Sequence, residues 1–140
     1  MRKKILVVTA NYYSDISSNL LNNSIKYLKE EANLDLTNQG VFIAEVPGVF
    51  ELPVIIANKI KEYHGFIALG CVIKGQTPHF DFISKATTDA IMKLSIEHKK
   101  PIGNGILTCL NKKQAIARSK TKGQEAAKAV LQVLDVLFRW

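Results

Sequence analysis

The chain has 140 residues, enough to enclose one hydrophobic core, and we expect a single domain over residues 1–140. Its hydrophobic content is 47%, but no apolar run approaches the roughly 18 residues that span a bilayer, so we expect no membrane partner. Its two cysteines have neither the spacing of a disulfide framework nor that of metal ligands, so we expect a cytoplasmic protein. The net charge of +7 is dispersed over lysines, which favours a solvated surface over nucleic-acid binding, with attraction of an anionic small substrate as the second explanation.

Short apolar runs alternate with longer amphipathic segments along the chain. In chain order we expect a strand at Lys4–Thr9, a helix at Ile16–Glu31, a strand at Val41–Val46, a helix at Phe50–Tyr63, a strand at Gly65–Val72, a helix at Phe82–Lys99, a strand at Ile102–Thr108 and a helical region from Lys112 onward. Gly123 is expected to divide that last region, with its second helix over Gln124–Trp140. The alternation predicts parallel βαβ units, and hence an α/β fold with a parallel four-stranded sheet in a three-layer, flavodoxin-like αβα arrangement.

Three segments with chemically useful residues directly follow predicted strands. They are Asn11–Ser14 after the first strand, Pro47–Glu51 after the second and Gly70–Phe80 at the end of the third. Open parallel sheets bind ligands beyond the carboxyl ends of their strands, and these three ends share one edge of the sheet. We therefore expect the three segments to converge on one pocket.

The third segment combines an anion-binding turn with a titratable group. Gly75 permits close backbone approach, and the amides of Gln76 and Thr77, just ahead of a helix, can donate to a phosphate together with the Thr77 hydroxyl. His79 follows within reach of that anion, and an ordinary histidine pKa of about 6.5 suits proton transfer near neutrality. The structural alternative is a first helical turn that carries a surface histidine.

The other two segments each allow a functional and a structural interpretation. Glu51 in a first helical turn favours the helix dipole, or it accepts hydrogen bonds from substrate hydroxyls. Tyr12 or Tyr13 either stacks on a flat heterocycle or closes the edge of the core. Cys71 is expected to be a small buried residue near the pocket, where its backbone matters more than its thiol.

Arg118 stands out because the chain otherwise has arginine only near its termini. An internal arginine in a lysine-rich chain suggests bidentate binding of a group such as a phosphate. Lys122 lies four residues on, and so on the same helical face if the helix continues that far. A solvated helix face is the alternative for both residues.

Four segments resemble, in order and spacing, the characteristic motifs of the lumazine synthase family. They are Val46–Pro53 (VPGVFELP), Gly70–Phe80 (GCVIKGQTPHF), Gly105–Thr108 with Gln114, Ala115 and Arg118, and Lys122–Ala127 (KGQEAA). The similarity extends over nearly the whole chain. It implies an enzyme of riboflavin biosynthesis that condenses 5-amino-6-(D-ribitylamino)uracil with 3,4-dihydroxy-2-butanone 4-phosphate to 6,7-dimethyl-8-ribityllumazine, phosphate and water, with no cofactor and no metal.

The resemblance also implies a role for each matching position. The pyrimidine-ring and ribityl contacts would come from Tyr12, Val49, Phe50, Glu51, Cys71, Val72 and Ile73, with Tyr12 stacking on the ring. The phosphate would be held by Gly75, Gln76, Thr77 and Arg118, and the four-carbon substrate would also meet Asn104 and Lys122. His79 would be the catalytic residue that transfers protons.

The chain departs from the family's pattern at three places. Asn104 stands where the family commonly has phenylalanine, so this contact is polar here. The spacing from Arg118 to Lys122 is a few residues shorter than usual, and the first core strand begins without the family's common preceding strand that pairs with a neighbour. The resemblance implies a homo-oligomer, with a pentamer expected and a larger shell left open, in which Asn104, Arg118 and Lys122 reach the site from a neighbouring subunit.

One alternative is a flavodoxin-like protein that binds a flavin or a lumazine without turnover. The polar Asn104 is the feature that favours it. His79, Arg118 and the predicted phosphate loop favour the enzyme, because a passive binder of the lumazine product would not need them.

Overall fold

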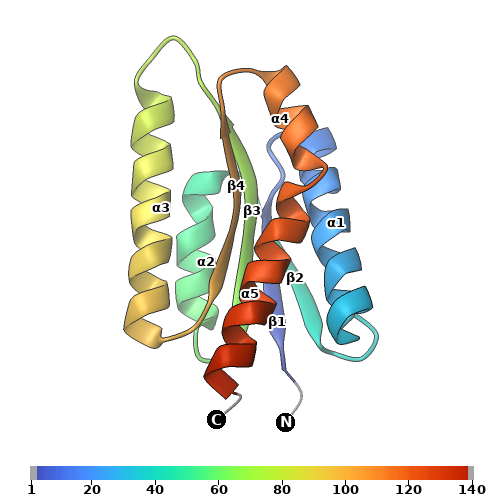
Figure 1. Ribbon diagram of the computed structural model, residues 1–140. Coiled ribbons are helices and arrows are strands. Elements are labelled where there is room, and N and C mark those ends of the chain that lie inside the picture. The colour runs from blue at the N-terminus through green and yellow to red at the C-terminus, as the bar shows by residue number, and fades with distance from the viewer. Residues whose placement is uncertain (1–2, 139–140) are drawn as a thin grey trace.

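The computed structural model describes residues 3–138, which form the alternating strands and helices of an α/β protein (Figure 1). In chain order the elements are β1 (Ile5–Ala10), α1 (Ser14–Ala32), β2 (Val41–Val46), the short 3-10 helix η1 (Val49–Glu51), α2 (Leu52–Lys59), β3 (Gly65–Ile73), α3 (His79–His98), β4 (Ile102–Cys109), α4 (Lys112–Ser119) and α5 (Lys122–Phe138). No helix among these combines the length and apolarity needed to cross a bilayer.

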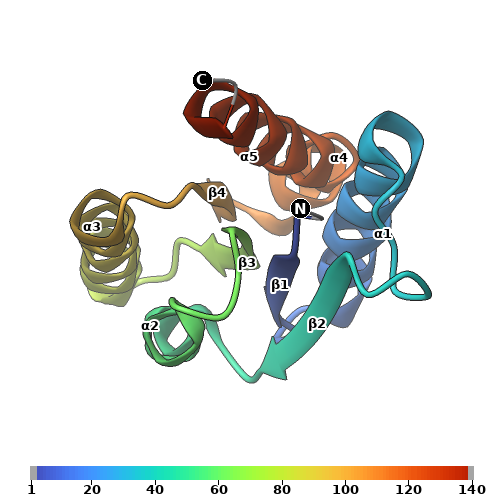
Figure 2. The same ribbon diagram turned by 90° about the horizontal axis from the view of Figure 1, so that it is seen from below.

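The sheet is parallel throughout, with strand order β2-β1-β3-β4. Helices α2 and α3 cover one face, and α1, α4 and α5 cover the other, as Figure 2 shows along the strands. The predicted three-layer αβα fold with a parallel four-stranded sheet is therefore confirmed. Parallel strands all end at the same edge, so the loops after β1, β2 and β3 lie together at one end of the molecule.

The central strand β1 contributes to both halves of the core. Ile5 and Val7 pack on the face covered by α1, α4 and α5, whereas Leu6 and Val8 pack on the face covered by α2 and α3. All four side chains are buried. This double burial explains why β1 reads as a continuous apolar run without a polar alternation.

The last helical region divides as predicted, but at a different residue. The chain leaves α4 after Ser119 and starts α5 at Lys122, so Gly123 lies inside α5 and the prediction that it separates the helices is wrong. A Cβ atom added at Gly123 would lie 2.1 Å from the carbonyl oxygen of Leu20 in α1. Gly123 is thus the point where α5 approaches the backbone of α1. The predicted helix end at Trp140 lies outside the described residues.

The start of α4 is capped by two side chains. Asn111 precedes the helix, and its Oδ1 accepts a hydrogen bond of 2.9 Å from the backbone N–H of Gln114. The Gln114 side chain returns one residue earlier than in a standard capping box, because its Oε1 accepts from the N–H of Leu110 at 2.9 Å. Two backbone donors at this helix start are thereby satisfied.

We expect Gly123→Ala to lower the free energy of unfolding by about 1–3 kcal/mol, the usual range for overpacking, because the new methyl group meets backbone atoms of α1. Urea unfolding followed by circular dichroism would measure the change. Gly75→Ala is the matched control, since a Cβ atom there would meet nothing within 4 Å. An alanine tolerated equally at both positions would contradict the close approach of α5 and α1.

His64 joins the loop after α2 to the start of β1. Its backbone N–H donates to the carbonyl oxygen of Lys4, and its Nδ1 accepts from the backbone N–H of Lys4, both at 2.9 Å. The imidazole also lies edge-on against Phe138 of α5, with ring centroids 5.9 Å apart. Burial, followed by the charges of Lys100, Lys4 and Lys3, lowers the pKa of His64 below its ordinary value.

Because the pKa of His64 is lower in the folded state than in the unfolded state, the free energy of unfolding depends on pH. The unfolded chain binds this proton more readily, so the contribution of His64 is complete above a pH of about 6.5 and is lost as the pH falls through the lower folded pKa. We expect His64→Asn, which keeps an acceptor for Lys4, to flatten the loss of stability between about pH 7.5 and pH 5. Urea midpoints at several pH values would test this, and identical slopes in both proteins would contradict it.

Candidate functional site

A cavity of about 470 Å³ lies where the loops after β1, β2 and β3 meet. Its lining residues come from all three predicted segments and from the start of α3: Tyr12, Tyr13, Gly48, Val49, Phe50, Glu51, Cys71, Val72, Ile73, His79 and Ile83. The volume falls within the range of about 300–1,000 Å³ that small-molecule sites occupy. The structure thus brings the three segments together at the carboxyl edge of the sheet.

Aromatic side chains form the open rim of the cavity. The Tyr12 side chain is 76% exposed and that of Phe50 is 61% exposed. The Tyr12 ring lies edge-on against Tyr13, with centroids 4.9 Å apart and planes at 84°. Exposed rings beside a cavity provide apolar faces that a flat ligand can cover.

The loop after β2 places a carboxylate in the cavity wall. Glu51 ends η1, whose turn is closed by a hydrogen bond of 3.2 Å from the Glu51 N–H to the carbonyl oxygen of Gly48. A Cβ atom at Gly48 would lie 3.1 Å from Oε1 of Glu51, so glycine leaves space for the carboxylate. A carboxylate at this position can accept hydrogen bonds from hydroxyl groups of a ligand.

The end of β3 forms the floor of the cavity. Cys71 packs with the core on the α1 side, whereas Val72 packs on the α2 and α3 side. Burial, followed by the nearby Cys109 and Asp15, raises the pKa of the Cys71 thiol to about 12. Cys71 is therefore a neutral thiol near neutrality and is unsuited to act as a nucleophile.

The loop that leads from β3 into α3 is exposed and lies at the N-terminus of a 20-residue helix. The backbone N–H of His79 donates to Oγ1 of Thr77 over 3.4 Å, and His79 itself lines the cavity as the first residue of α3. The free N–H groups and the dipole of a helix N-terminus favour an anion. A phosphate held by Gly75–Thr77 would therefore lie beside an accessible imidazole.

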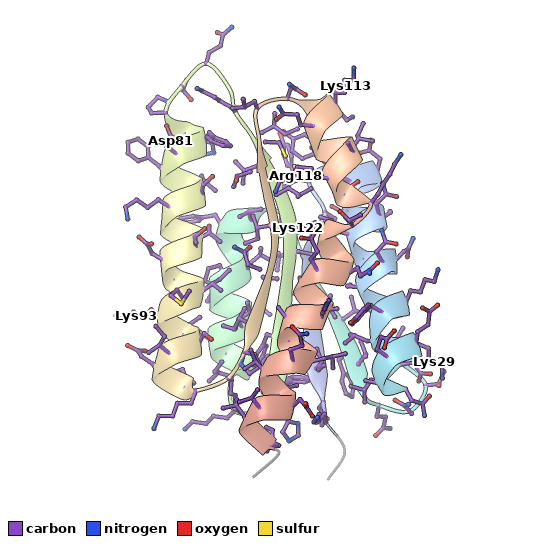
Figure 3. All side chains as sticks on the ribbon, viewed as in Figure 1. Lys29, Asp81, Lys93, Lys113, Arg118 and Lys122 are labelled. Carbon is purple, nitrogen blue, oxygen red and sulfur yellow. The ribbon has the colours of Figure 1, made fainter. Side chains whose placement is uncertain are left out.

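Six predicted site residues do not line this cavity: Gly75, Gln76 and Thr77 lie in the exposed loop after β3, and Asn104, Arg118 and Lys122 lie elsewhere in the chain. Arg118 lies on α4, where its Nη1 donates to Sγ of Cys109 at 3.9 Å, and Lys122 is the first residue of α5 (Figure 3). The two residues are in different helices, so the condition for a shared helical face, one helix that continues from Arg118 to Lys122, is not met. Asn104 is exposed in the edge strand β4, and its Oδ1 accepts from the N–H of Ile106 at 3.0 Å.

Sequence reasoning missed two lining residues and left one choice open. Gly48 belongs to the predicted segment Pro47–Glu51 but has no predicted role of its own, and Ile83 is not singled out, although it follows His79 by four positions on α3. Both Tyr12 and Tyr13 line the cavity, and Tyr13 also packs against the core, so the choice between stacking and closing the core edge stays open. Among residues 3–138, no group of three or more His, Cys, Asp or Glu side chains gathers that could hold a metal ion.

The fold and the site together define a flavodoxin-like α/β protein with a small-molecule site beyond the carboxyl ends of its strands. A model of the 6,7-dimethyl-8-ribityllumazine synthase family matches residues 2–137. The chain is also similar to proteins named 6,7-dimethyl-8-ribityllumazine synthase from Agrobacterium fabrum (40% identity over 94% of this chain and 93% of the relative), Bartonella tribocorum (42%, 100% and 95%) and Bartonella henselae (43%, 97% and 89%). The chain belongs to the 6,7-dimethyl-8-ribityllumazine synthase family, and it is an enzyme, a transferase of riboflavin biosynthesis.

Proposed function

We propose that the cavity between Tyr12 and His79 is where this chain condenses 5-amino-6-(D-ribitylamino)uracil with 3,4-dihydroxy-2-butanone 4-phosphate to 6,7-dimethyl-8-ribityllumazine. The observation that carries the proposal is that the family-matching residues of three separate loops line one cavity. The heterocycle stacks on Tyr12 and lies over the strand end formed by Cys71, Val72 and Ile73. The ribityl hydroxyls reach the carboxylate of Glu51, with Val49 and Phe50 beside them.

The reaction explains the demand for a proton-transfer group. The 5-amino nitrogen attacks the ketone carbon, and water leaves as an imine forms. Loss of a proton from the four-carbon chain then allows phosphate to leave. The enol left at the hydroxyl-bearing carbon tautomerises to a ketone. The ribitylamino nitrogen then closes the ring on this new carbonyl, and a second water leaves. His79 accepts and returns protons in these steps, and the cavity contributes by holding two substrates together.

The phosphate lies at the loop Gly75–Thr77 and the N-terminus of α3. We propose that Arg118 completes this site from a neighbouring subunit of a homo-oligomer, with Lys122 and Asn104 nearby. In its own chain Arg118 belongs to α4, in the layer across the sheet from α3. A pentamer is the expected unit, and assembly into a larger shell stays a separate question.

Helix α3 offers support for a contact between copies. Its side chains Phe82, Met92 and Ile96 are apolar and more than half exposed. Large exposed apolar side chains on one helix favour burial against a protein partner. Sedimentation velocity would give the mass of the assembly, and a monomer at working concentration would contradict the composite site.

We further propose that residues 1–140 form one domain that works in the cytoplasm. One sheet connects the first and last strands of the described chain, which supports a single domain. Both cysteines are free thiols, as a reducing compartment would keep them.

A direct assay with both substrates tests the proposed reaction by following the absorbance or fluorescence of the lumazine product. Product formation that scales with protein concentration, above the uncatalysed background, supports the proposal. Product binding without turnover, even at high protein concentration, would instead support the passive binder that Asn104 first suggested.

A further inference from the structure

Tyr12, the stacking residue of the proposed site, has one aromatic neighbour, Tyr13, which has no role in the proposed function. Tyr12 stands in the short loop between β1 and α1, and 76% of its side chain is exposed. A side chain with so much exposure samples several rotamers unless a neighbour limits it. Tyr13 lies against it at 4.9 Å between centroids, and the planes cross at 84°, the edge-to-face geometry that aromatic pairs favour.

Tyr13 is held much more firmly than Tyr12. Its side chain is half-buried and packs against the core on the α1 side of the sheet. Its backbone carbonyl oxygen accepts the first hydrogen bond of α1, from the N–H of Ser17 at 2.8 Å. The Ser17 hydroxyl in turn donates to the carbonyl oxygen of Ala10 at the end of β1, also at 2.8 Å. Tyr13 is therefore fixed to both the strand and the helix.

A ligand that stacks on a mobile ring must also order that ring, and this ordering weakens binding. A ring whose orientation is already set avoids the loss. We propose that Tyr13 is a positioning residue that holds the Tyr12 ring in the orientation in which it stacks on the flat heterocycle of the substrate. This inference rests on the stacking role of Tyr12 in the proposed function.

Two other roles for Tyr13 predict different results. Tyr13 also lines the cavity, so it could touch the ligand directly. It also packs on the core, so its loss could act only by lowering stability. A double-mutant cycle between Tyr12 and Tyr13 separates these roles, because a residue that acts through Tyr12 has nothing to act on once Tyr12 is removed.

The test measures the dissociation constant of 6,7-dimethyl-8-ribityllumazine by its fluorescence for wild type, Tyr12→Ala, Tyr13→Leu, Tyr13→Phe and the Tyr12→Ala/Tyr13→Leu double variant. Leucine keeps an apolar group on the core, and phenylalanine keeps the ring edge without the hydroxyl. Tyr63→Leu is the matched control, because Tyr63 also lies edge-on against aromatic rings, at 5.6 Å from Phe42, but outside the cavity. Thermal unfolding of every variant separates folding from binding.

We expect Tyr13→Leu to weaken binding by about two- to tenfold, the strength of an edge-to-face pair, with KM for the aminopyrimidine raised and kcat little changed. Tyr13→Phe should bind as wild type does, and Tyr63→Leu should lose stability without losing affinity. In the Tyr12→Ala background Tyr13→Leu should have no further effect.

Three results would overturn the inference: an additive loss in the double variant, a loss in Tyr13→Phe as large as in Tyr13→Leu, or wild-type binding in Tyr13→Leu. Wild-type binding by Tyr12→Ala would overturn the stacking role of Tyr12 in the proposed function. This outcome differs from the three above, which overturn only the positioning role of Tyr13.

Discussion

His79→Ala is expected to lower kcat by about 10²–10⁴-fold without abolishing turnover, because general acid–base catalysis typically contributes this factor. His79 is exposed and is the first residue of α3, so its replacement leaves the core intact and removes only the imidazole from the cavity lining. The residual rate comes from holding two substrates together, an effect that can contribute about 7–11 kcal/mol in favourable cases. Single-turnover kinetics with product fluorescence would measure the chemical step.

His98→Ala is the matched control for this experiment. His98 is the exposed last residue of the same helix, at the opposite end from the cavity. It should turn over at the wild-type rate. An equal loss in both variants would show that α3 itself is disturbed. An unchanged rate in His79→Ala would contradict the role of His79 in proton transfer. A rate no higher than background while both substrates still bind would contradict the contribution from holding the substrates together.

The fold was accessible from sequence because its two central strands, β1 and β3, are buried on both faces. Runs such as Ile5–Val8 carry no polar alternation, and only a parallel sheet between two helical layers accounts for several such runs separated by amphipathic helices. Gly123 was placed wrongly because glycine usually ends helices. Glycine is needed at this position because a larger residue would clash with the carbonyl oxygen of Leu20. Leu20 lies about a hundred positions earlier in the chain, so no local sequence pattern reveals the contact.

The site was accessible in part for the same reason. Once the strands were placed, the loops that carry Tyr12, Glu51 and His79 had to share one edge of the sheet. Ile83 was missed because an apolar residue on an amphipathic helix looks like any core residue. Arg118 does not line the cavity of its own chain, and its role in the site stays a prediction that rests on the proposed second copy.

Arg118→Ala is expected to lower kcat/KM by about 10²–10³-fold, the usual result of removing a preorganised group that stabilises developing negative charge. Arg118→Lys should recover only part of the activity, because lysine keeps the charge but loses the planar bidentate fork. Lys113→Ala is the matched control, since Lys113 is an exposed cation on the same helix α4. A comparable loss in Lys113→Ala would mean that the general positive field of α4 is what matters.

The origin of Arg118 in a neighbouring subunit can be tested by mixing two impaired proteins. If each site combines the His79 of one subunit with the Arg118 of the next, unfolding and refolding an equal mixture of His79→Ala and Arg118→Ala chains restores both residues to about a quarter of the interfaces of a ring. Activity should then rise to about a quarter of the wild-type value, far above either parent. If both residues served the same chain, every site would still lack one of them, and the mixture would show only the average of its two components. Recovery on mixing therefore depends on the shared site alone and not on how much either residue contributes to the rate.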